Sequence, residues 1–482
     1  MRVVTWRRGA GDPPQPLGKS MKKTISIPLP VLLMFAALPA CSAAPENAGE
    51  SADAVLHVQP NHFSLVQVAA GANHACAIMN GGLLKCWGIN EDGQLGLGDK
   101  ENRGDGAGEM GDALPYVDLG TGRKAKFVSP ALTHTCAILD DGSVKCWGKN
   151  DKGQLGLGHT KSRGKKSGQM GDALKTVDLG KGRSAKAISA GFGDSTCVIL
   201  DNDRVKCWGN SGFGQLGLGD LNNRGDEADE MGDALPYVDL GTGRTAKAIS
   251  NRSSEVCALL DNNAVKCWGL GGWGGLGLGD PFDRGDAPGE MGDALPAVDL
   301  GTGRTAIAVA SGWSQGCAIL DNGSLKCWGY NDDGELGLGD VVGRGNAPGR
   351  MGDALPTVNL GTGRTAKSVS IGVNTTCVLL DDLSVKCWGV NRGGDLGSGS
   401  LVSTGSVPSD MGDGLPAVRL GVAGWASGLS VGGGFACASS RLAGIKCWGS
   451  NTYGQLGQGD VADRGDEPGE MGPKLKPIDL GK

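Results

Sequence analysis

The sequence predicts an all-β fold, a seven-bladed β-propeller, and three observations support this prediction. First, a Cys-Trp-Gly triplet recurs 60 or 61 residues apart, and its seven tryptophans are Trp87, Trp147, Trp208, Trp268, Trp328, Trp388 and Trp448. A regular period over most of a chain indicates a repeat architecture. Second, each copy contains about four short apolar runs separated by Gly, Asn and Asp, which is typical of β-strands and turns. Third, each copy carries two cysteines at a fixed spacing. Four antiparallel strands repeated around an axis form a propeller.

The first and last runs of each copy predict an inner and an outer strand. The first run is rich in small residues, as in AKAISAG at 185–191, and suits a crowded inner strand. The fourth is ALPYVDLG at 113–120 or a close variant. An open solenoid is the alternative, but it would need polar capping repeats, and the sequence shows none. Residues 54–58 align with the fourth run, so we expect them to help close the ring.

The second and third runs predict a β-hairpin that a disulfide closes. If the turn centres on Gly81, Cys76 faces Cys86 across the two strands, close enough for an S–S bond. Reduced, buried thiols are the alternative. Zinc is disfavoured because the chain has five His and no CxxC motif. The predicted bridges are Cys76–Cys86, Cys136–Cys146, Cys197–Cys207, Cys257–Cys267, Cys317–Cys327, Cys377–Cys387 and Cys437–Cys447. Alternation along a strand points the next residue, Trp87, to the opposite face, where we expect it to separate neighbouring sheets.

The beginning of the chain predicts export and a lipid anchor. Residues 21–40 have a basic start and an apolar stretch, as in a secretory signal. They end in Leu38-Pro39-Ala40-Cys41, which resembles the lipobox of bacterial lipoproteins, so Cys41 is the expected lipidation site. An ordinary secretory signal is the alternative. Residues 1–20 read as a mis-assigned start, 41–53 as a flexible tether and 54–482 as the propeller. The predicted location is the bacterial cell envelope, facing the periplasm or the outside.

The charge of the chain argues against a nucleic-acid partner. The formal net charge is −6, and the chain after residue 40 carries 40 basic and 51 acidic residues, a net charge of −11. Binding to nucleic acid or to anionic lipid requires a basic surface. We therefore expect no nucleic-acid partner, and contact with a membrane through the lipid anchor alone.

The repeat resembles a known family. The pattern GxxHxCAL…DGxVxCWGxNxxGQLGxGD, followed over residues 55–480, is similar to the repeat of the regulator of chromosome condensation family. That resemblance implies a seven-bladed propeller. The family's namesake is a nuclear exchange factor for a small GTPase and binds chromatin. The export signal, lipobox, cysteine pairs and acidic character of this chain argue against both of those activities here.

Each copy also has a long loop between its third and fourth runs. In the first copy this loop is rich in glycine and carboxylates, and Asp99, Asp105, Glu109 and Asp112 could form an oxygen cage for Ca²⁺. Turns and caps within the loop are the alternative. The second and sixth copies replace most of these residues, for example with His159 and Ser400, so we expect no required metal and no cofactor.

No catalytic constellation stands out, and we expect no enzymatic activity. His74 and His134 fill a repeat position that other copies give to Ser195, Glu255, Gln315, Thr375 and Phe435, which is typical of a surface loop rather than of a general base. The sequence contains no GxSxG, HExxH or P-loop motif.

The copies differ most at one end of the predicted propeller. The loops after the first and third strands fall on the same end, and they collect seven of the fifteen aromatic residues outside the repeated Trp. Aromatics and Arg are enriched at binding hot spots. The alternative is that these side chains plug the propeller mouth or pack under the long loops. The predicted partner-binding residues are Phe192, Phe213, Arg252, Trp273, Trp313, Tyr330, Arg392, Phe435 and Tyr453.

The predicted function is therefore protein binding by a monomeric, lipid-anchored propeller outside the cytoplasm, with an unknown protein as partner. The alternatives are an exported carbohydrate-binding or hydrolytic protein, since exposed aromatics also stack on sugars, and an exchange factor like the family's namesake.

Overall fold

A computed structural model describes residues 67–421, 426–440 and 444–481, all within one compact unit, Gly49–Lys482. These residues form seven three-stranded antiparallel sheets, numbered here as blades 1 to 7 in chain order. Blade 1 consists of β1 (Gln67–Ala70), β2 (His74–Ile78) and β3 (Leu84–Gly88). The prediction of a seven-bladed all-β propeller is confirmed.

The other blades repeat this order. Their strands are β4 (Ala125–Pro130), β5 (His134–Leu139), β6 (Val144–Gly148), β7 (Ala185–Ala190), β8 (Ser195–Leu200), β9 (Val205–Gly209), β10 (Ala246–Asn251), β11 (Glu255–Leu260), β12 (Val265–Gly269), β13 (Ala306–Ser311), β14 (Gln315–Leu320), β15 (Leu325–Gly329), β16 (Ala366–Ile371), β17 (Thr375–Leu380), β18 (Val385–Gly389), β19 (Gly428–Val431), β20 (Phe435–Ser440) and β21 (Gly444–Gly449). Short 3₁₀ turns complete the inventory: η1 (Asn80–Gly82), η2 (Gly111–Ala113), η3 (Gly171–Ala173), η4 (Gly232–Ala234), η5 (Gly292–Ala294), η6 (Gly352–Ala354), η7 (Pro408–Asp410) and η8 (Gly412–Gly414).

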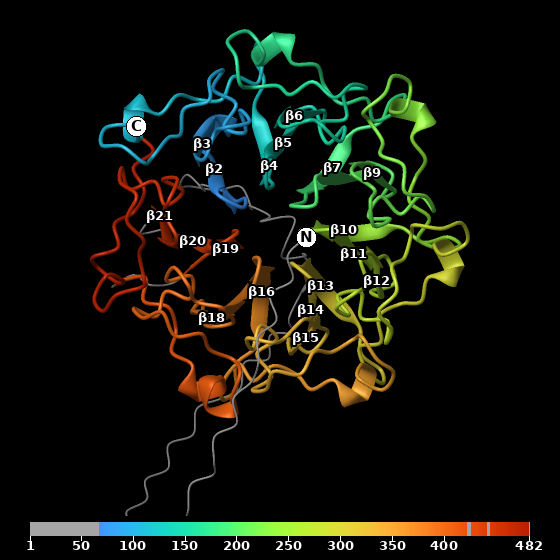
Figure 1. The fold of residues 1–482 in the computed structure, drawn as a ribbon, viewed down its shortest axis with the longest axis vertical. Coiled ribbons are helices and arrows are strands. Elements are labelled where there is room, and N and C mark those ends of the chain that lie inside the picture. The colour runs from blue at the N-terminus through green and yellow to red at the C-terminus, as the bar shows by residue number, and fades with distance from the viewer. Residues whose placement is uncertain (1–66, 422–425, 441–443, 482) are drawn as a thin grey trace, which may run out of the picture. The chain divides into compact units, whose positions relative to one another are not determined.

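The blades close into a ring. Figure 1 shows first strands such as β4, β10 and β16 nearest the centre and the third strands farther out. The first strand of each blade packs against the first strand of the next, and β19 packs against β1. Their small residues allow this close approach, as the sequence predicted. The described residues therefore form a closed propeller and not an open solenoid.

The predicted fourth strand is not a strand. In blade 1 this outer segment makes one ladder-like contact, from the Val117 N–H to the Leu84 carbonyl at 2.8 Å, and it lies outside the three-stranded sheet. Two features contribute to the difference in blade 1, although blades 2 and 7 have Lys175 and Lys476 at the position of Pro115 and form no strand there either. Pro115 has no N–H to donate to a ladder, and the 3₁₀ turn η2 immediately precedes it. The segment still packs against the blade, because Leu114, Val117 and Leu119 are buried.

The predicted hairpin register is confirmed in every blade. Cys76 pairs with Cys86 across β2 and β3, and all seven cysteine pairs form disulfides. The Trp after the second cysteine of each pair points to the opposite face. As a result, the disulfide of blade 1 and Trp147 of blade 2 belong to the same buried cluster, and the remaining junctions between blades repeat this arrangement.

Two hydrogen bonds recur at each junction. The Trp147 indole N–H donates to the Gln94 carbonyl of the preceding blade at 3.0 Å. The Lys145 ammonium, which sequence reasoning did not assign, donates to the Leu119 carbonyl of the preceding blade at 2.9 Å and to the Gly171 carbonyl of its own blade at 2.7 Å. Burial lowers the pKa of this lysine, and the charges of Asp172 and Asp118 oppose that effect.

The junction between the last and first blades has the same chemistry. Trp87 donates to the Gln455 carbonyl at 3.0 Å, and Lys85 donates to the Leu480 carbonyl at 2.8 Å. The Gly433 N–H also donates to the Ala72 carbonyl at 3.0 Å. The ring thus closes through side chains and loops of complete blades.

The two ends of the propeller carry different loops. The Ile89 N–H donates to the Asn73 carbonyl at 3.0 Å, so the loops after the first and third strands share one end, here called the loop face. The hairpin turns and the blade-to-blade turns share the other end, the turn face, where Arg123 forms ion pairs with Asp140 and Asp141. Both assignments match the sequence prediction.

The predicted signal peptide, lipidation site Cys41, tether and strand at 54–58 lie outside the described residues. Within the ranges that are described, no helix is both long and apolar enough to cross a membrane.

Candidate protein-binding face

Six of the nine predicted partner-binding residues reach the surface of the loop face. Trp273, Trp313 and Phe213 are exposed to 56%, 52% and 41%, and Arg392 is also exposed. Tyr330 and Tyr453 are half-buried. These residues come from blades 3 to 7.

The other three fill the propeller itself. Arg252 extends from blade 4 and donates to the carbonyls of Ile371 at 3.1 Å, of Ala70 at 3.1 Å and of Val431. Its guanidinium also lies over the Phe192 ring, 5.1 Å from the centroid. This arrangement joins blade 4 to blades 6, 7 and 1. For Arg252 it agrees with the alternative given by the sequence, in which these side chains plug the propeller mouth.

Phe435 is not in a loop, contrary to the sequence prediction. It is the first residue of β20 and is buried in the cluster between blades 7 and 1. Phe192 is buried as well. Neither ring offers a free surface, so the exposed set is Phe213, Trp273, Trp313, Tyr330, Arg392 and Tyr453.

Two aromatics at the loop face, from neighbouring blades, touch. The Trp273 and Tyr330 rings meet edge to face, with centroids 5.6 Å apart and an interplanar angle of 83°. Trp273 sits in the turn 271–274, which the Gly274 N–H closes by donating to the Gly271 carbonyl at 2.8 Å. A turn closed by its own hydrogen bond is a rigid support for a binding side chain.

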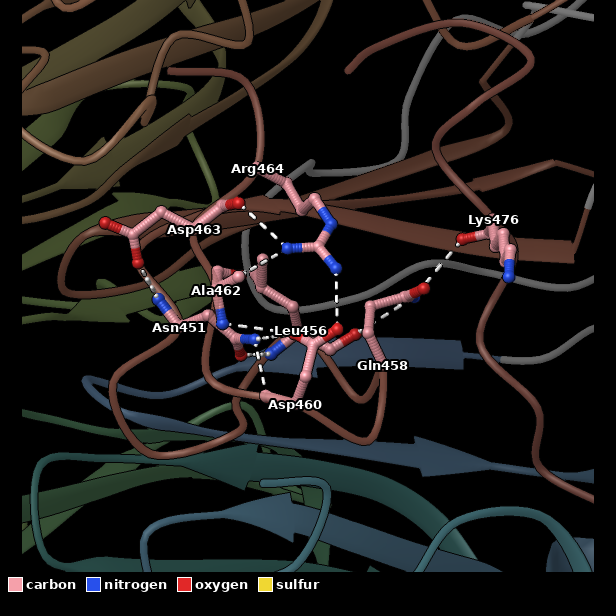
Figure 2. Close-up of polar contacts among 8 residues, drawn as sticks. All are labelled: Asn451, Leu456, Gln458, Asp460, Ala462, Asp463, Arg464 and Lys476. Carbon is pink, nitrogen blue, oxygen red and sulfur yellow. Dashed lines mark hydrogen bonds and ion pairs between the residues drawn. The ribbon is translucent and has the colours of Figure 1, made fainter. Parts of the chain in front are cut away.

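The long loop of each blade begins with a structure that side chains hold in place, shown for blade 7 in Figure 2. The Asn451 amide donates to the Asp460 carbonyl at 2.8 Å, and the Leu456 N–H donates to the Asn451 side-chain oxygen at 2.9 Å. Arg464 then pairs with the Asp460 carboxylate at 2.7 Å. The equivalent Asp–Arg pair, four residues apart, recurs in blades 1, 3, 4 and 5. The residues between Asp and Arg are therefore held outward at the edge of the loop face.

That outward position is apolar in blades 3 to 7, a feature that sequence reasoning missed. Phe282 is 65% exposed and Val402 67%. An alignment of the copies at the two residues after the Asp of the Asp–Arg pair would have revealed this apolar character. The large apolar side chains exposed at these two positions are Leu221, Phe282, Val341, Val342, Leu401, Val402 and Val461, and the remaining exposed residues there are Asn222, Pro281 and Ala462.

Blades 1 and 2 place charged and polar residues at the same two positions. Blade 1 has Lys100 and Glu101, and blade 2 has Thr160 and Lys161. Together with the exposed aromatics, the apolar positions of blades 3 to 7 form an arc, here called the apolar arc. Exposed apolar patches of this kind mark interaction sites.

Beneath the loop face lies a buried position that varies between blades. It holds His74 and His134, which we expected at the surface and which are fully buried instead. The His74 Nε2 lies 2.8 Å from the Thr135 hydroxyl and the His134 Nε2 lies 3.0 Å from the Thr196 hydroxyl. Burial lowers the pKa of each imidazole to about 3, and for His74 the charge of His134 contributes. Both rings are neutral at physiological pH, and they serve the packing between blades.

Blades 4 to 6 bury carboxyl groups instead. Burial raises the pKa of Glu255 well above its usual range, and its carboxylate fills the space that a side chain at Gly275 would occupy. Burial also raises the pKa of Glu335, and that of Asp395 to about 6. Glu335 and Asp395 occupy the position that holds Gln94 in blade 1.

The acidic residues of the long loop in blade 1 form hydrogen bonds and ion pairs with other residues of the chain. The Asp99 carboxylate accepts from the Asn90 amide at 2.9 Å and pairs with Arg103 at 2.7 Å. Glu109 accepts from the Gly104 and Gly106 N–H groups, both at 2.9 Å. These contacts are the turns and caps that the sequence offered as the alternative to a calcium site. Across the described part of the chain, no group of three or more His, Cys, Asp or Glu is placed to hold a metal ion.

Comparison with known proteins agrees with this architecture. The regulator of chromosome condensation (RCC1) repeat matches residues 65–94, 132–154, 185–215 and 306–335. The ultraviolet-B receptor UVR8 of Arabidopsis thaliana is 28% identical over 402 residues, which cover 82% of this chain and 79% of that protein. The chain contains RCC1 repeats in a seven-bladed propeller.

Two further matches show how widely the repeat is used. The human E3 ubiquitin-protein ligase HERC2 is 28% identical over 284 residues, 58% of this chain but only 5% of that protein. The structure of Prp20p from Saccharomyces cerevisiae, described together with its binding to Gsp1p and histones, has a TM-score of 0.58 at 18% identity and covers 77% of this chain and 82% of its own. That structural likeness concerns the fold alone. For this RCC1-repeat propeller, the repeat and fold favour a protein-interaction or regulatory module.

Proposed function

We propose that this RCC1-repeat propeller is a non-enzymatic, monomeric interaction module that binds a protein partner through the apolar arc on its loop face. One observation carries the proposal: most of the large exposed apolar side chains lie in the loops of blades 3 to 7, while blades 1 and 2 expose only Leu83, Tyr116 and Leu132 among their described residues. Aromatic anchors such as Trp273 and Trp313 surrounded by aliphatic residues have the composition of a binding hot spot. Exposing such residues without a partner would favour aggregation.

The proposal includes a place in the cell. We propose that the chain is exported and anchored by a lipid on Cys41. The signal-like residues 21–40 support this, and so do the seven disulfides, because disulfides persist in oxidising compartments. β1 begins at the turn face, the end of the propeller opposite the apolar arc.

The anchor has its own test. Mass spectrometry of the mature protein from a membrane fraction should find a diacylated Cys41 at the N-terminus, and Cys41→Ala should release the protein into the soluble fraction. A cytoplasmic, unprocessed chain would contradict the proposed location and would support the alternative of an exchange factor.

Binding is tested by cross-linking the full chain in its native cells and comparing the partners of three forms. Trp273→Ala combined with Phe282→Ser should weaken recovery of the partner by roughly 30-fold, since loss of a hot spot costs about 2 kcal/mol. The control is Leu83→Ser, because Leu83 is 44% exposed but lies on the turn face. If the double variant retains the partner as well as the control does, the apolar arc is not the binding face.

A second candidate is carbohydrate binding, which the perpendicular Trp273 and Tyr330 rings favour because aromatic rings stack on sugars. The aliphatic residues Val341, Leu401 and Val402 favour a protein instead, since they offer a sugar neither a flat ring nor a hydrogen bond. A glycan array probed with the full chain distinguishes the two candidates: binding that Trp273→Ala abolishes would support the carbohydrate.

A further inference from the structure

The aromatic pair of blades 4 and 5 is joined to a loop that carries a third aromatic. The Tyr330 N–H donates to the Ser314 carbonyl at 2.9 Å, which ties the backbone of Tyr330 to the residue next to Trp313. The Trp273 and Trp313 side chains are both more than half exposed. We call this group, Trp273, Trp313 and Tyr330, the aromatic corner.

Carboxyl groups adjoin the aromatic corner. Asp332 and Asp333 are exposed in the turn that the Gly334 N–H closes on the Asn331 carbonyl at 3.3 Å. Glu335 follows them and is buried, and its Oε1 has no hydrogen-bond partner. The pKa of the Tyr330 phenol is raised by burial, by its hydrogen bond with Asp332 and by the negative charges of Asp332, Glu335 and Asp333. These acids therefore lie near the Tyr330 phenol.

No ion pair among the described residues balances these charges. None of the ion pairs found in the described ranges includes Asp332, Asp333 or Glu335. The same turn in blade 2 differs, because there Lys149 pairs with Asp151 at 3.2 Å. The turn in blade 5 thus presents an uncompensated negative charge next to exposed rings.

Apolar loops adjoin the aromatic corner. The Phe282 carbonyl approaches Gly271 so closely that no Cβ would fit there, and a Cβ on Gly274 would meet the Arg344 carbonyl 2.5 Å away. The turn that carries Trp273 is thus packed against the long loops of blades 4 and 5. Those loops carry the exposed residues Phe282, Val341 and Val342.

We propose that the aromatic corner and its carboxylates receive a lysine or arginine side chain from a protein segment whose neighbouring residues are apolar. This inference rests on the proposed function and adds the chemistry of the partner. A cation gains from the faces of Trp and Tyr rings and from the carboxylates beside them, while Phe282, Val341 and Val342 bury the apolar neighbours. The negative charge also steers a basic segment toward the face.

The test selects peptides against the full chain. A phage-displayed library of random peptides is panned on the wild-type protein, and the affinities of the selected peptides are measured by fluorescence anisotropy. We expect a Lys or Arg with apolar residues on both sides. Asp332→Asn with Asp333→Asn should weaken binding about tenfold and reduce its dependence on salt.

The matched control is Glu91→Gln with Asp92→Asn, which neutralises the same turn in blade 1 and should leave binding unchanged. Thermal melting of each variant checks that the fold is intact. Selected peptides that lose affinity with Trp273→Ala but contain no cation would overturn this inference and leave the proposed binding face standing. Peptides indifferent to Trp273→Ala would overturn both. If tetramethylammonium alone binds as tightly as the selected peptides, the occupant is a small cation and the proposed segment is wrong.

Discussion

Two regions of the loop face, blades 1 and 2 and blades 3 to 7, repeat the same loops but differ in polarity. Blades 1 and 2 carry charged or polar residues at positions where blades 3 to 7 carry apolar ones. At the two outward positions of the long loop, blade 1 has Lys100 and Glu101, whereas blade 6 has Leu401 and Val402. In the turn after the third strand, blade 2 has Lys152 where blade 4 has Trp273. The junctions between blades do not follow this division, since Trp147 and Trp328 both donate to the carbonyl of the preceding blade.

The difference separates the scaffold from the function within one chain. A residue that holds a junction meets the same neighbours in each blade, so the repeat keeps it. An outward loop residue meets solvent, and most substitutions there change stability by less than about 0.5 kcal/mol. The apolar character of five successive blades is therefore not required by the fold, and binding explains it better. The predictions below test this division, from the largest expected effect to the smallest.

The largest expected effect on stability tests whether the Trp residues at the junctions stabilise the two regions equally. Trp147→Ala and Trp328→Ala should each lower the free energy of unfolding by about 3–5 kcal/mol, because each removes a fully buried ring and leaves a cavity. Urea denaturation of the full chain measures both values. If one variant lowers the free energy of unfolding by less than half as much as the other, the blades do not share one scaffold.

The next prediction concerns acid stability in the region of blades 1 and 2. The folded-state pKa of His134 is about 3, below the ordinary value of 6.5, so the unfolded state binds the proton first. Stability is therefore lost as the pH falls from 6.5 toward 3, by about 3 kcal/mol at pH 4. His134→Thr, which introduces the residue type of Thr375 at that position, should show a smaller loss between pH 7 and pH 4 in urea denaturation. An equal loss would mean that this imidazole is not held neutral.

Blade 6 should respond to pH in the opposite direction. Burial raises the pKa of Asp395 from 3.8 to about 6, so its contribution is most favourable below pH 4 and is lost as the pH rises through 6. The effect of Asp395→Asn on the free energy of unfolding should therefore be more favourable at pH 8 than at pH 4, by about 2–3 kcal/mol. Thermal melting at the two pH values checks the sign. A variant that is more destabilising at pH 8 than at pH 4 would contradict it.

The smallest effect on stability is expected from exchanging the surfaces. Leu401→Lys with Val402→Glu introduces the pair of blade 1 into blade 6 and should change the free energy of unfolding by less than about 0.5 kcal/mol. The variant should bind less of a fluorescent apolar dye such as anilinonaphthalene sulfonate. The reverse exchange, Lys100→Leu with Glu101→Val, should bind more. Unchanged dye binding in both variants would mean that the apolar arc is not accessible.

Much of the fold followed from local patterns. The spacing of Cys76 and Cys86 gives their pairing, and alternation along a strand gives the opposite direction of Trp87. The candidate face was predictable in part, since Trp273 and Trp313 stand in loops that differ between copies. Phe282 and Val402 were missed because the comparison concerned other loop positions, although the same alignment of copies contains them.

The sequence by itself determined the number of blades, the hairpin register, the disulfides and the face of each strand that carries the Trp. These properties depend on spacing along the chain, so period and alternation are sufficient. Only the tertiary structure decided that Arg252 spans the propeller mouth, that His74 is buried and that the segment around Val117 forms no strand. The carbonyl groups that the Arg252 side chain binds lie more than a hundred residues away, and whether a side chain is exposed depends on what the closed ring brings against it.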